Sequence, residues 1–196
     1  KCLINNHMIR ITGCDNRIRE KIRLASEWYL KHLLQKRTRE KLKIYIHIKR
    51  GLATTEKVEA ECIWNEDIET PRPKNFIIHI DDKLTLRQKL LALAHEMVHL
   101  KQWATGEMYE YVRKPHLYRW RGNTIDTRKK HYYELPWEVE SHGRELGMFI
   151  RMCEHYKWGK EEWTQEKDIN SLIKVLKKYE KKFDENGNII QRPLDK

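Results

Sequence analysis

Apolar residues recur along the chain at the spacings of helices and strands. The first helix is predicted over about 15–35, with Asp15 as its N-cap. Its apolar face follows steps of three and four and consists of Ile18, Ile22, Ala25, Tyr29 and Leu33. Strict alternation of apolar and polar residues then predicts strands at 43–49 and 58–64, and a third strand is predicted at 76–80.

Short connections between these strands favour a small, mainly antiparallel sheet of three strands or slightly more. A second helix follows at about 86–104, where Thr85 and Gln88 form a capping box and Gly106 ends the helix. The fold class is therefore predicted as α+β. The strand before this helix, at 75–80, is the candidate edge that an extended peptide could join by strand addition.

Inside the second helix, the apolar run 90–100 contains the pattern His-Glu-x-x-His, formed by His95, Glu96 and His99. Residues four apart lie on one helix face, so both histidines can reach a single metal ion. Such a pattern also arises by chance, most often on a solvated face. Here it lies among Leu, Ala, Met and Val, where polar groups need partners. A Zn²⁺ site is the favoured interpretation, with Glu96 as the base that activates water.

The remainder of the chain is predicted as a connection and further helices. Residues 107–135 show little periodicity and interleave aromatic with basic residues. That mixture suits contact with unpaired nucleic acid or an acidic chain, although packing of the aromatics over the sheet is slightly favoured for any single residue. Pro136 can begin a helix over 136–155, and polar helices are predicted at 160–167 and 168–183 before a loose tail. The predicted organisation is a domain over 1–156 and a helical extension over 157–196.

A catalytic zinc ion usually has three protein ligands, so one more is expected downstream of His99. The candidates are His116, His131, Glu138, Glu140 and His142. Glu140 is preferred because Gly143 and Gly147 share its helix face, and glycines there would let two helices approach closely. Glu138 points nearly the opposite way and is the second choice. Both could also be ordinary acids of a helix start.

Net charge, cysteine content and apolar run length restrict the possible partners and the location of the protein. The chain has 196 residues with a net charge of +11, which favours contact with nucleic acid as much as a passive basic surface. The four cysteines form no zinc-finger spacing and are read as reduced thiols of a cytoplasmic protein. No stretch has the length and apolarity of a membrane span or a signal peptide, so no membrane partner is expected.

Two stretches resemble known peptidases. The stretch 93–99 around His95 is similar to the zinc motif of SprT-like metallopeptidases. The stretch 134–141 resembles the LPWEvEA stretch of small, phage-type metallopeptidases, and it is also similar to a stretch in ImmA/IrrE-type enzymes. The resemblance covers about 76–150 and implies a minimal zincin-like fold. In the thermolysin-like clan the ligand Glu precedes an Ala, which maps to Glu140 followed by Ser141. Those enzymes place a supporting acid one turn later, where this chain has Arg144.

The leading hypothesis is thus a zinc-dependent peptidase that acts on a protein or peptide substrate. Glu96 would serve as general base, and His131, Tyr132 or Tyr133 would stabilise the oxyanion. The resemblance to SprT-like proteins implies that the substrates are proteins attached to DNA. The resemblance to ImmA/IrrE-type enzymes implies instead a regulatory protease that cleaves a repressor. The rival hypothesis is a basic nucleic-acid-binding protein whose zinc site is structural or inactive.

Overall fold

The structure is a computed structural model that describes residues 8–65, 70–111 and 113–165. The chain divides into two compact units, Lys1–Thr164 and Gln165–Lys196, and all described helices and strands belong to the first. This unit extends beyond the predicted boundary at residue 156, since Trp158 and Thr164 are both buried. The predicted helix at 168–183 and the tail lie outside the described residues.

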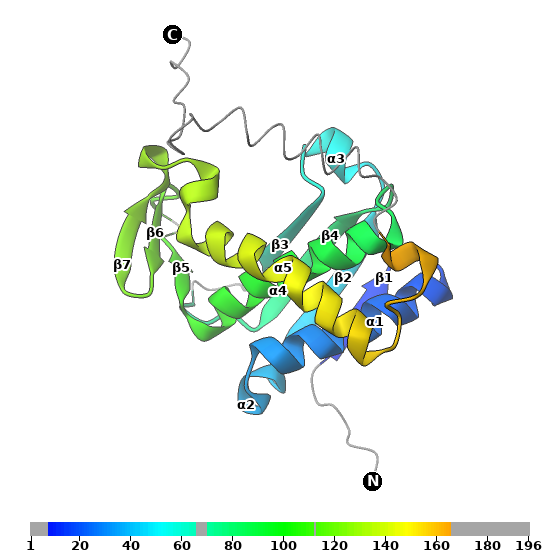
Figure 1. Ribbon diagram of the computed structural model, residues 1–196. Helices are drawn as coiled ribbons and strands as arrows, with labels where there is room; N and C mark the ends of the chain where they lie inside the picture. Colours follow the sequence, from blue (N-terminus) through cyan, green and yellow to red (C-terminus); the bar gives the residue numbers. More distant parts are fainter. Residues whose placement is uncertain (1–7, 66–69, 112, 166–196) are drawn as a thin grey trace, which may run out of the picture. The chain divides into compact units, whose positions relative to one another are not determined.

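The fold is α+β, as predicted (Figure 1). Its strands form two sheets and are β1 (Met8–Thr12), β2 (Lys43–Lys49), β3 (Ala60–Trp64), β4 (Asn75–Asp81), β5 (Met108–Glu110), β6 (Leu117–Trp120) and β7 (Asn123–Asp126). Its helices are α1 (Asn16–Leu33), α2 (Lys36–Arg39), α3 (Leu52–Thr55), α4 (Leu86–Thr105) and α5 (Pro136–His155). Short 3₁₀ turns are η1 (Thr127–Lys129), η2 (Tyr132–Glu134) and η3 (Glu162–Thr164), the last within the predicted helix at 160–167.

The larger sheet has the order β1-β2-β4-β3, with β1, β2 and β4 parallel and β3 antiparallel at one edge. The four strands agree with the predicted number, but the prediction of mainly antiparallel pairing was wrong. Two features produce the parallel pairs. Helix α1 is the crossover that returns the chain from β1 to a parallel β2, and β3 lies outside β4 instead of between β2 and β4, which pair in parallel. Because β4 pairs on both sides, the predicted edge strand is internal, and β3 is the edge that remains beside α4.

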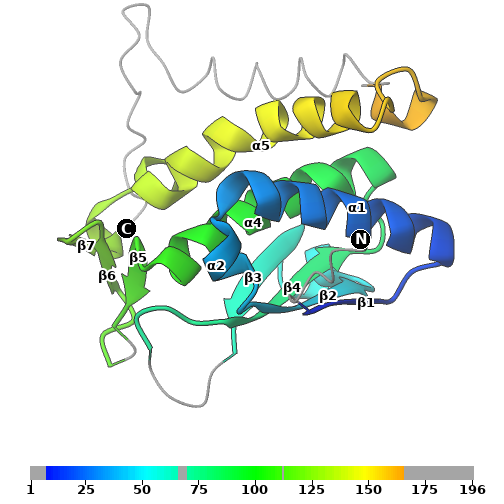
Figure 2. The ribbon, with the colours of Figure 1, turned by 90° about the horizontal axis from the view of Figure 1, so that it is seen from below.

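Helices α1 and α4 cover one face of this sheet, and α5 lies over α4 on the side away from the sheet (Figure 2). The predicted caps are confirmed: the Asp15 carboxylate accepts from the Ile18 amide at 2.9 Å, and Thr85 and Gln88 form a capping box on α4. Gly106 ends α4 with φ of 75°, in the left-handed region that glycine adopts without strain.

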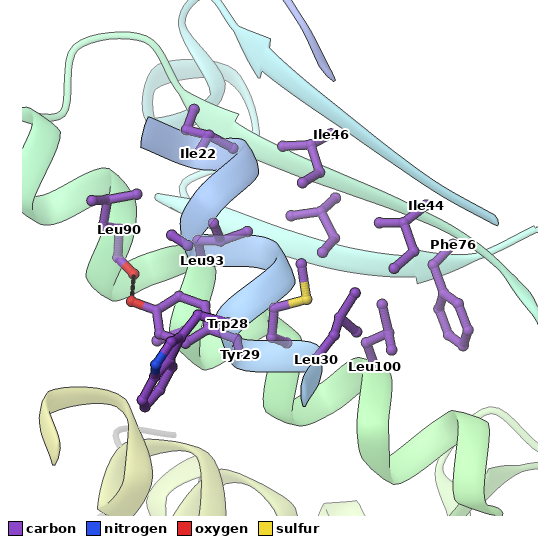
Figure 3. Close-up of a cluster of buried hydrophobic side chains, with 14 of the residues drawn as sticks. Ile22, Trp28, Tyr29, Leu30, Ile44, Ile46, Phe76, Leu90, Leu93 and Leu100 are labelled. Atoms are coloured by element: carbon purple, nitrogen blue, oxygen red, sulfur yellow. Dashed lines mark hydrogen bonds between the residues drawn. The ribbon is translucent and has the colours of Figure 1, made fainter. Parts of the chain in front are cut away.

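The core between helices and sheet consists of large apolar side chains such as Leu30, Ile44 and Phe76, all fully buried. Tyr29 is buried with them, and its hydroxyl donates a hydrogen bond of 3.1 Å to the backbone carbonyl of Leu90 (Figure 3). That bond satisfies the one polar atom of the ring and joins α1 to α4. Helix α4 is therefore held both by the sheet and by α1, which fixes the position of its histidines.

The stretch 107–135, predicted as an irregular connection, contains the antiparallel sheet β5-β6-β7. Its aromatic residues partly pack inward: the Tyr118 and Trp120 rings lie 5.0 and 6.1 Å from the ring of Trp137 in α5. These strands have three or four residues each, too short for periodicity to reveal. In the described residues, no helix is long and apolar enough to cross a membrane.

Candidate metal centre

Helix α4 places His95 and His99 on one face, one turn apart, with 8% and 9% of their surfaces exposed. Their Nε2 atoms face each other at 3.0 Å. The first turn of α5 adds Glu138, whose Oε2 lies 3.4 Å from each of these nitrogens. Ligand atoms about 2.0–2.1 Å from a tetrahedral metal ion such as zinc are about 3.3–3.4 Å apart. The two distances to Glu138 match this spacing and the distance between the nitrogens is somewhat shorter, so the three donor atoms are close enough together to share one metal ion.

The other ring nitrogens of the histidines are held by acceptors. His95 Nδ1 lies 2.8 Å from a carboxylate oxygen of Glu145, and His99 Nδ1 lies 2.9 Å from the amide oxygen of Gln102. If each Nδ1 donates its proton there, each Nε2 carries a lone pair. Two nitrogen lone pairs and the Glu138 carboxylate then converge on one buried point, an arrangement that a cation stabilises.

Glu140, the preferred third ligand, is not part of this group. Its carboxylate accepts from Lys101 at 3.0 Å and from Gln102 at 3.2 Å, and it pairs with Arg121 and Arg144 at 3.3 and 3.0 Å. The structure instead brings Glu138, the second choice, to the histidines. Positions 138 and 140 lie about 200° apart around a helix, so the two acids meet α4 at different places: Glu138 at the histidines and Glu140 at Lys101 and Gln102.

Gly143 and Gly147 do not bring α5 close to α4, as was expected for Glu140. Gly143 and Gly147 are exposed, and a Cβ added at either one would meet nothing within 4 Å. They therefore lie on the outer face of α5 and permit no close approach to α4. The face that packs on α4 carries Glu138, Ser141 and Glu145.

The resemblance to known peptidases left the supporting acid in doubt, since Arg144 stands at the expected position. With Glu138 as the ligand, that role falls to Glu145, two turns further along α5. Sequence reasoning missed both Glu145 and Gln102. Glu145 lies seven residues after Glu138, but this spacing becomes informative only once Glu138 is chosen over Glu140.

The charges in the centre perturb one another. Burial opposes the charged form of His95, but the Glu138 and Glu145 carboxylates outweigh it and raise its pKa to about 10. Burial likewise opposes ionisation of Glu138, yet its contacts with the histidines hold its pKa well below the usual range. Glu145 behaves in the same way, with a pKa lowered to about 2 by His142 and His95 against the effect of burial. Both carboxylates therefore remain charged at neutral pH.

Glu96, the predicted base, is buried with 6% exposure at the wall of a cleft. Burial raises the pKa of its carboxyl, against the opposing influence of His99 and His95. Within the described part of the chain, no hydrogen bond or ion pair occupies its carboxylate. Glu96 is thus available to a molecule that enters the cleft, and its raised pKa suits a proton acceptor near neutral pH.

The cleft has a volume of about 380 Å³ and brings together residues of four regions. The edge strand β3 supplies Ala60, Glu61 and Cys62 to its lining, and α4 supplies the two candidate ligands His95 and His99. Tyr132 and Glu138 also line the cleft, and the Tyr132 hydroxyl donates to Glu138 at 2.6 Å. An extended chain in this cleft would run beside the unpaired edge of β3.

The other predicted residues have different roles. His131 is exposed and caps η2 through Glu134, so it does not reach the cleft. His116 lies outside both groups of donor atoms that could hold a metal in the described residues. His142 belongs to the second of these groups, with His95 and Glu145.

Comparison with protein-family models, curated proteins and solved structures finds no match to this chain. The likeness to SprT-like and ImmA/IrrE-type peptidases is therefore carried by the two short motifs alone.

Proposed function

We propose that the protein is a zinc-dependent peptidase, with His95, His99 and Glu138 as the zinc ligands. The observation that carries the proposal is the convergence of two buried Nε2 atoms and one carboxylate oxygen, 3.0–3.4 Å apart, beside the free carboxylate of Glu96. Two histidines and one glutamate form a donor set typical of hydrolytic zinc. When bound there, zinc supplies a Lewis acid that polarises water and the substrate carbonyl.

The chain's own residues supply the proton transfers. Glu96 takes a proton from the attacking water as its oxygen bonds to the carbonyl carbon. The carboxyl then gives that proton to the amide nitrogen as the C–N bond breaks. Tyr132, with its hydroxyl at the mouth of the centre, is the candidate donor to the oxyanion once it leaves Glu138. The edge of β3 aligns the substrate backbone as an added strand.

The decisive variant is Glu96→Gln, which removes the base and keeps the size of the side chain. We expect zinc content to equal that of the parent and hydrolysis of an unfolded, fluorescently labelled protein to fall below detection. Glu154→Gln, at an exposed position of α5, is the matched control and should cleave like the parent. Undiminished cleavage by Glu96→Gln, or parent protein purified without chelator and free of zinc, would refute the proposal.

A second candidate function is binding of nucleic acid, with the metal centre in a structural role. It is favoured by the net charge of +11 and by exposed basic residues on and around the small sheet: Arg113, Lys114, Lys129 and Lys130. Arg119 also lies 5.0 Å above the Tyr109 ring, an arrangement that can accept a base. Affinity for single-stranded DNA that falls steeply with salt, in the absence of cleavage, would favour this function.

A further inference from the structure

Helix α5 presents two more donors to His95, beyond the ligand Glu138. His142 lies one turn after Glu138, and Glu145 lies two turns after Glu138, so all three residues share one face of the helix. The Glu145 Oε2 atom lies 2.8 Å from His95 Nδ1 and 3.5 Å from His142 Nδ1. The donor atoms of His95, His142 and Glu145 all lie within 4.8 Å of one another. The His95 ring therefore stands between two groups of donors.

The two groups differ in their access to solvent. The Glu138 side chain is 8% exposed, whereas those of His142 and Glu145 are 42% and 30% exposed. The His142 ring is nevertheless held in place, because its centroid lies 4.5 Å from that of His95 and 5.6 Å from that of Tyr133. This outer group is a pre-formed pair of ligands that a hydrated ion can reach.

We propose that His142 and Glu145 form a second, weaker Zn²⁺ site that fills only when zinc is in excess. A neutral imidazole has one lone pair, and in the zinc centre His95 uses it at Nε2. His95 can then offer only an N–H on the outer side, so the second ion has two protein ligands and completes its shell with water. Fewer ligands and greater exposure make this site weaker than the buried one.

Filling this site would disturb the first. Glu145 fixes the orientation of His95 through the 2.8 Å hydrogen bond to Nδ1. A second ion that draws on the same carboxylate oxygen weakens this bond. Excess zinc would therefore lower peptidase activity. This consequence rests on the proposed function, whereas the binding of the second ion is independent of whether the protein is a peptidase.

Binding is tested on the full chain by equilibrium dialysis against buffered free Zn²⁺, with metal analysis of the protein. The parent should bind one ion tightly and a second one at higher free zinc. His142→Ala should keep the tight ion and lose the second, whose affinity falls by at least about tenfold. His155→Ala, an exposed histidine in the last turn of the same helix, is the matched control and should still bind two ions.

The outcomes separate the two proposals. A parent that stops at one tight ion, or a His142→Ala variant that binds the second ion like the parent, overturns the outer site alone. A parent that lacks the tight ion contradicts the zinc centre itself. In the activity assay, excess zinc should inhibit the parent and His155→Ala but leave His142→Ala near its own basal rate. Equal inhibition of all three would contradict the proposed effect on Glu145.

Discussion

Substitution of Glu138 and of Glu140 by glutamine distinguishes the two acids that the sequence offered as third ligand, with Glu140 as first choice and Glu138 as second. Each change keeps the size of the side chain and removes one charge. In the structure Glu138 completes the group of donor atoms with His95 and His99, while Glu140 contacts Lys101, Gln102, Arg121 and Arg144. We therefore expect Glu138→Gln to lose zinc and Glu140→Gln to keep it, with a cost in stability instead.

The size of each effect follows from the contacts. A ligand that binds only the folded state at 100 times its Kd adds about 2.7 kcal/mol of stability, which raises Tm of a chain of this size by about 5–10 °C. The parent and Glu140→Gln should show this zinc-dependent rise. Glu138→Gln should show little, because loss of a ligand costs more than the about 10–100-fold in affinity that an outer partner provides.

Glu140→Gln should instead unfold more easily with or without zinc. Its side chain is 11% exposed, and Lys101 keeps Glu107 as a second partner at 2.7 Å. The arginines that pair with Glu140 are 50–55% exposed, so the loss is smaller than that of a fully buried pair. We expect about 1–3 kcal/mol, or a fall in Tm of about 3–10 °C.

The assay is thermal unfolding of chelator-treated protein, followed by titration with zinc. The reasoning would be refuted if Glu138→Gln gained as much stability from zinc as the parent. It would also be refuted if Glu140→Gln lost the zinc-dependent rise while its metal-free Tm was unchanged, since that result would identify Glu140 as the ligand.

Three further predictions follow from the centre. Glu145→Gln should bind zinc about 10–100-fold more weakly by competition with a chromogenic chelator, because His95 Nδ1 loses its charged acceptor; unchanged affinity would exclude a positioning role. Tyr132→Phe should keep its zinc and lose about a hundredfold in kcat, whereas an equal kcat would remove Tyr132 from the mechanism. In metal-free protein the pKa of His95 is raised from 6.5 to about 10, so its contribution to stability is fully present below pH 6.5 and is lost as pH rises through about 10. A His95→Gln variant should lack this part of the dependence of Tm on pH, and identical profiles would contradict it.

Much of the fold could be predicted because its signals are local. Helix α4 carries its own capping box and terminal glycine, and β2 alternates strictly in burial as in sequence. Pairing direction is not local. Strand β2 runs parallel to β1, a five-residue strand whose pattern is too short to read, and parallel to β4, because β3 pairs on the far side of β4. The strands of the small sheet are shorter still, and their pairing to each other defines them more than their composition does.

Predicting the third ligand required knowing which face of α5 packs on α4, and the apolar pattern of that helix is ambiguous. Trp137, Phe149 and Met152 are buried, whereas Val139, Leu146 and Ile150 are 57%, 49% and 47% exposed. Apolar residues thus lie on two faces, and the sequence does not show which one packs on α4. The inward face also carries polar groups at Ser141 and Glu145, which a search for an apolar stripe passes over.

The two acids of the 136–140 stretch nevertheless act on the same pair of histidines. Glu138 reaches both Nε2 atoms directly. Glu140 accepts from the amide nitrogen of Gln102, whose oxygen then faces Nδ1 of His99. An amide can rotate by 180°, which would present a donor to that nitrogen and favour the wrong tautomer. Glu140 and the Trp137 carbonyl both hold the amide nitrogen of Gln102, which selects the rotamer that leaves the lone pair of His99 at the metal-binding atom. Glu140 is therefore a positioning residue that acts on His99 through Gln102. Because its effect is indirect, Glu140→Gln should weaken zinc binding less than Gln102→Leu does.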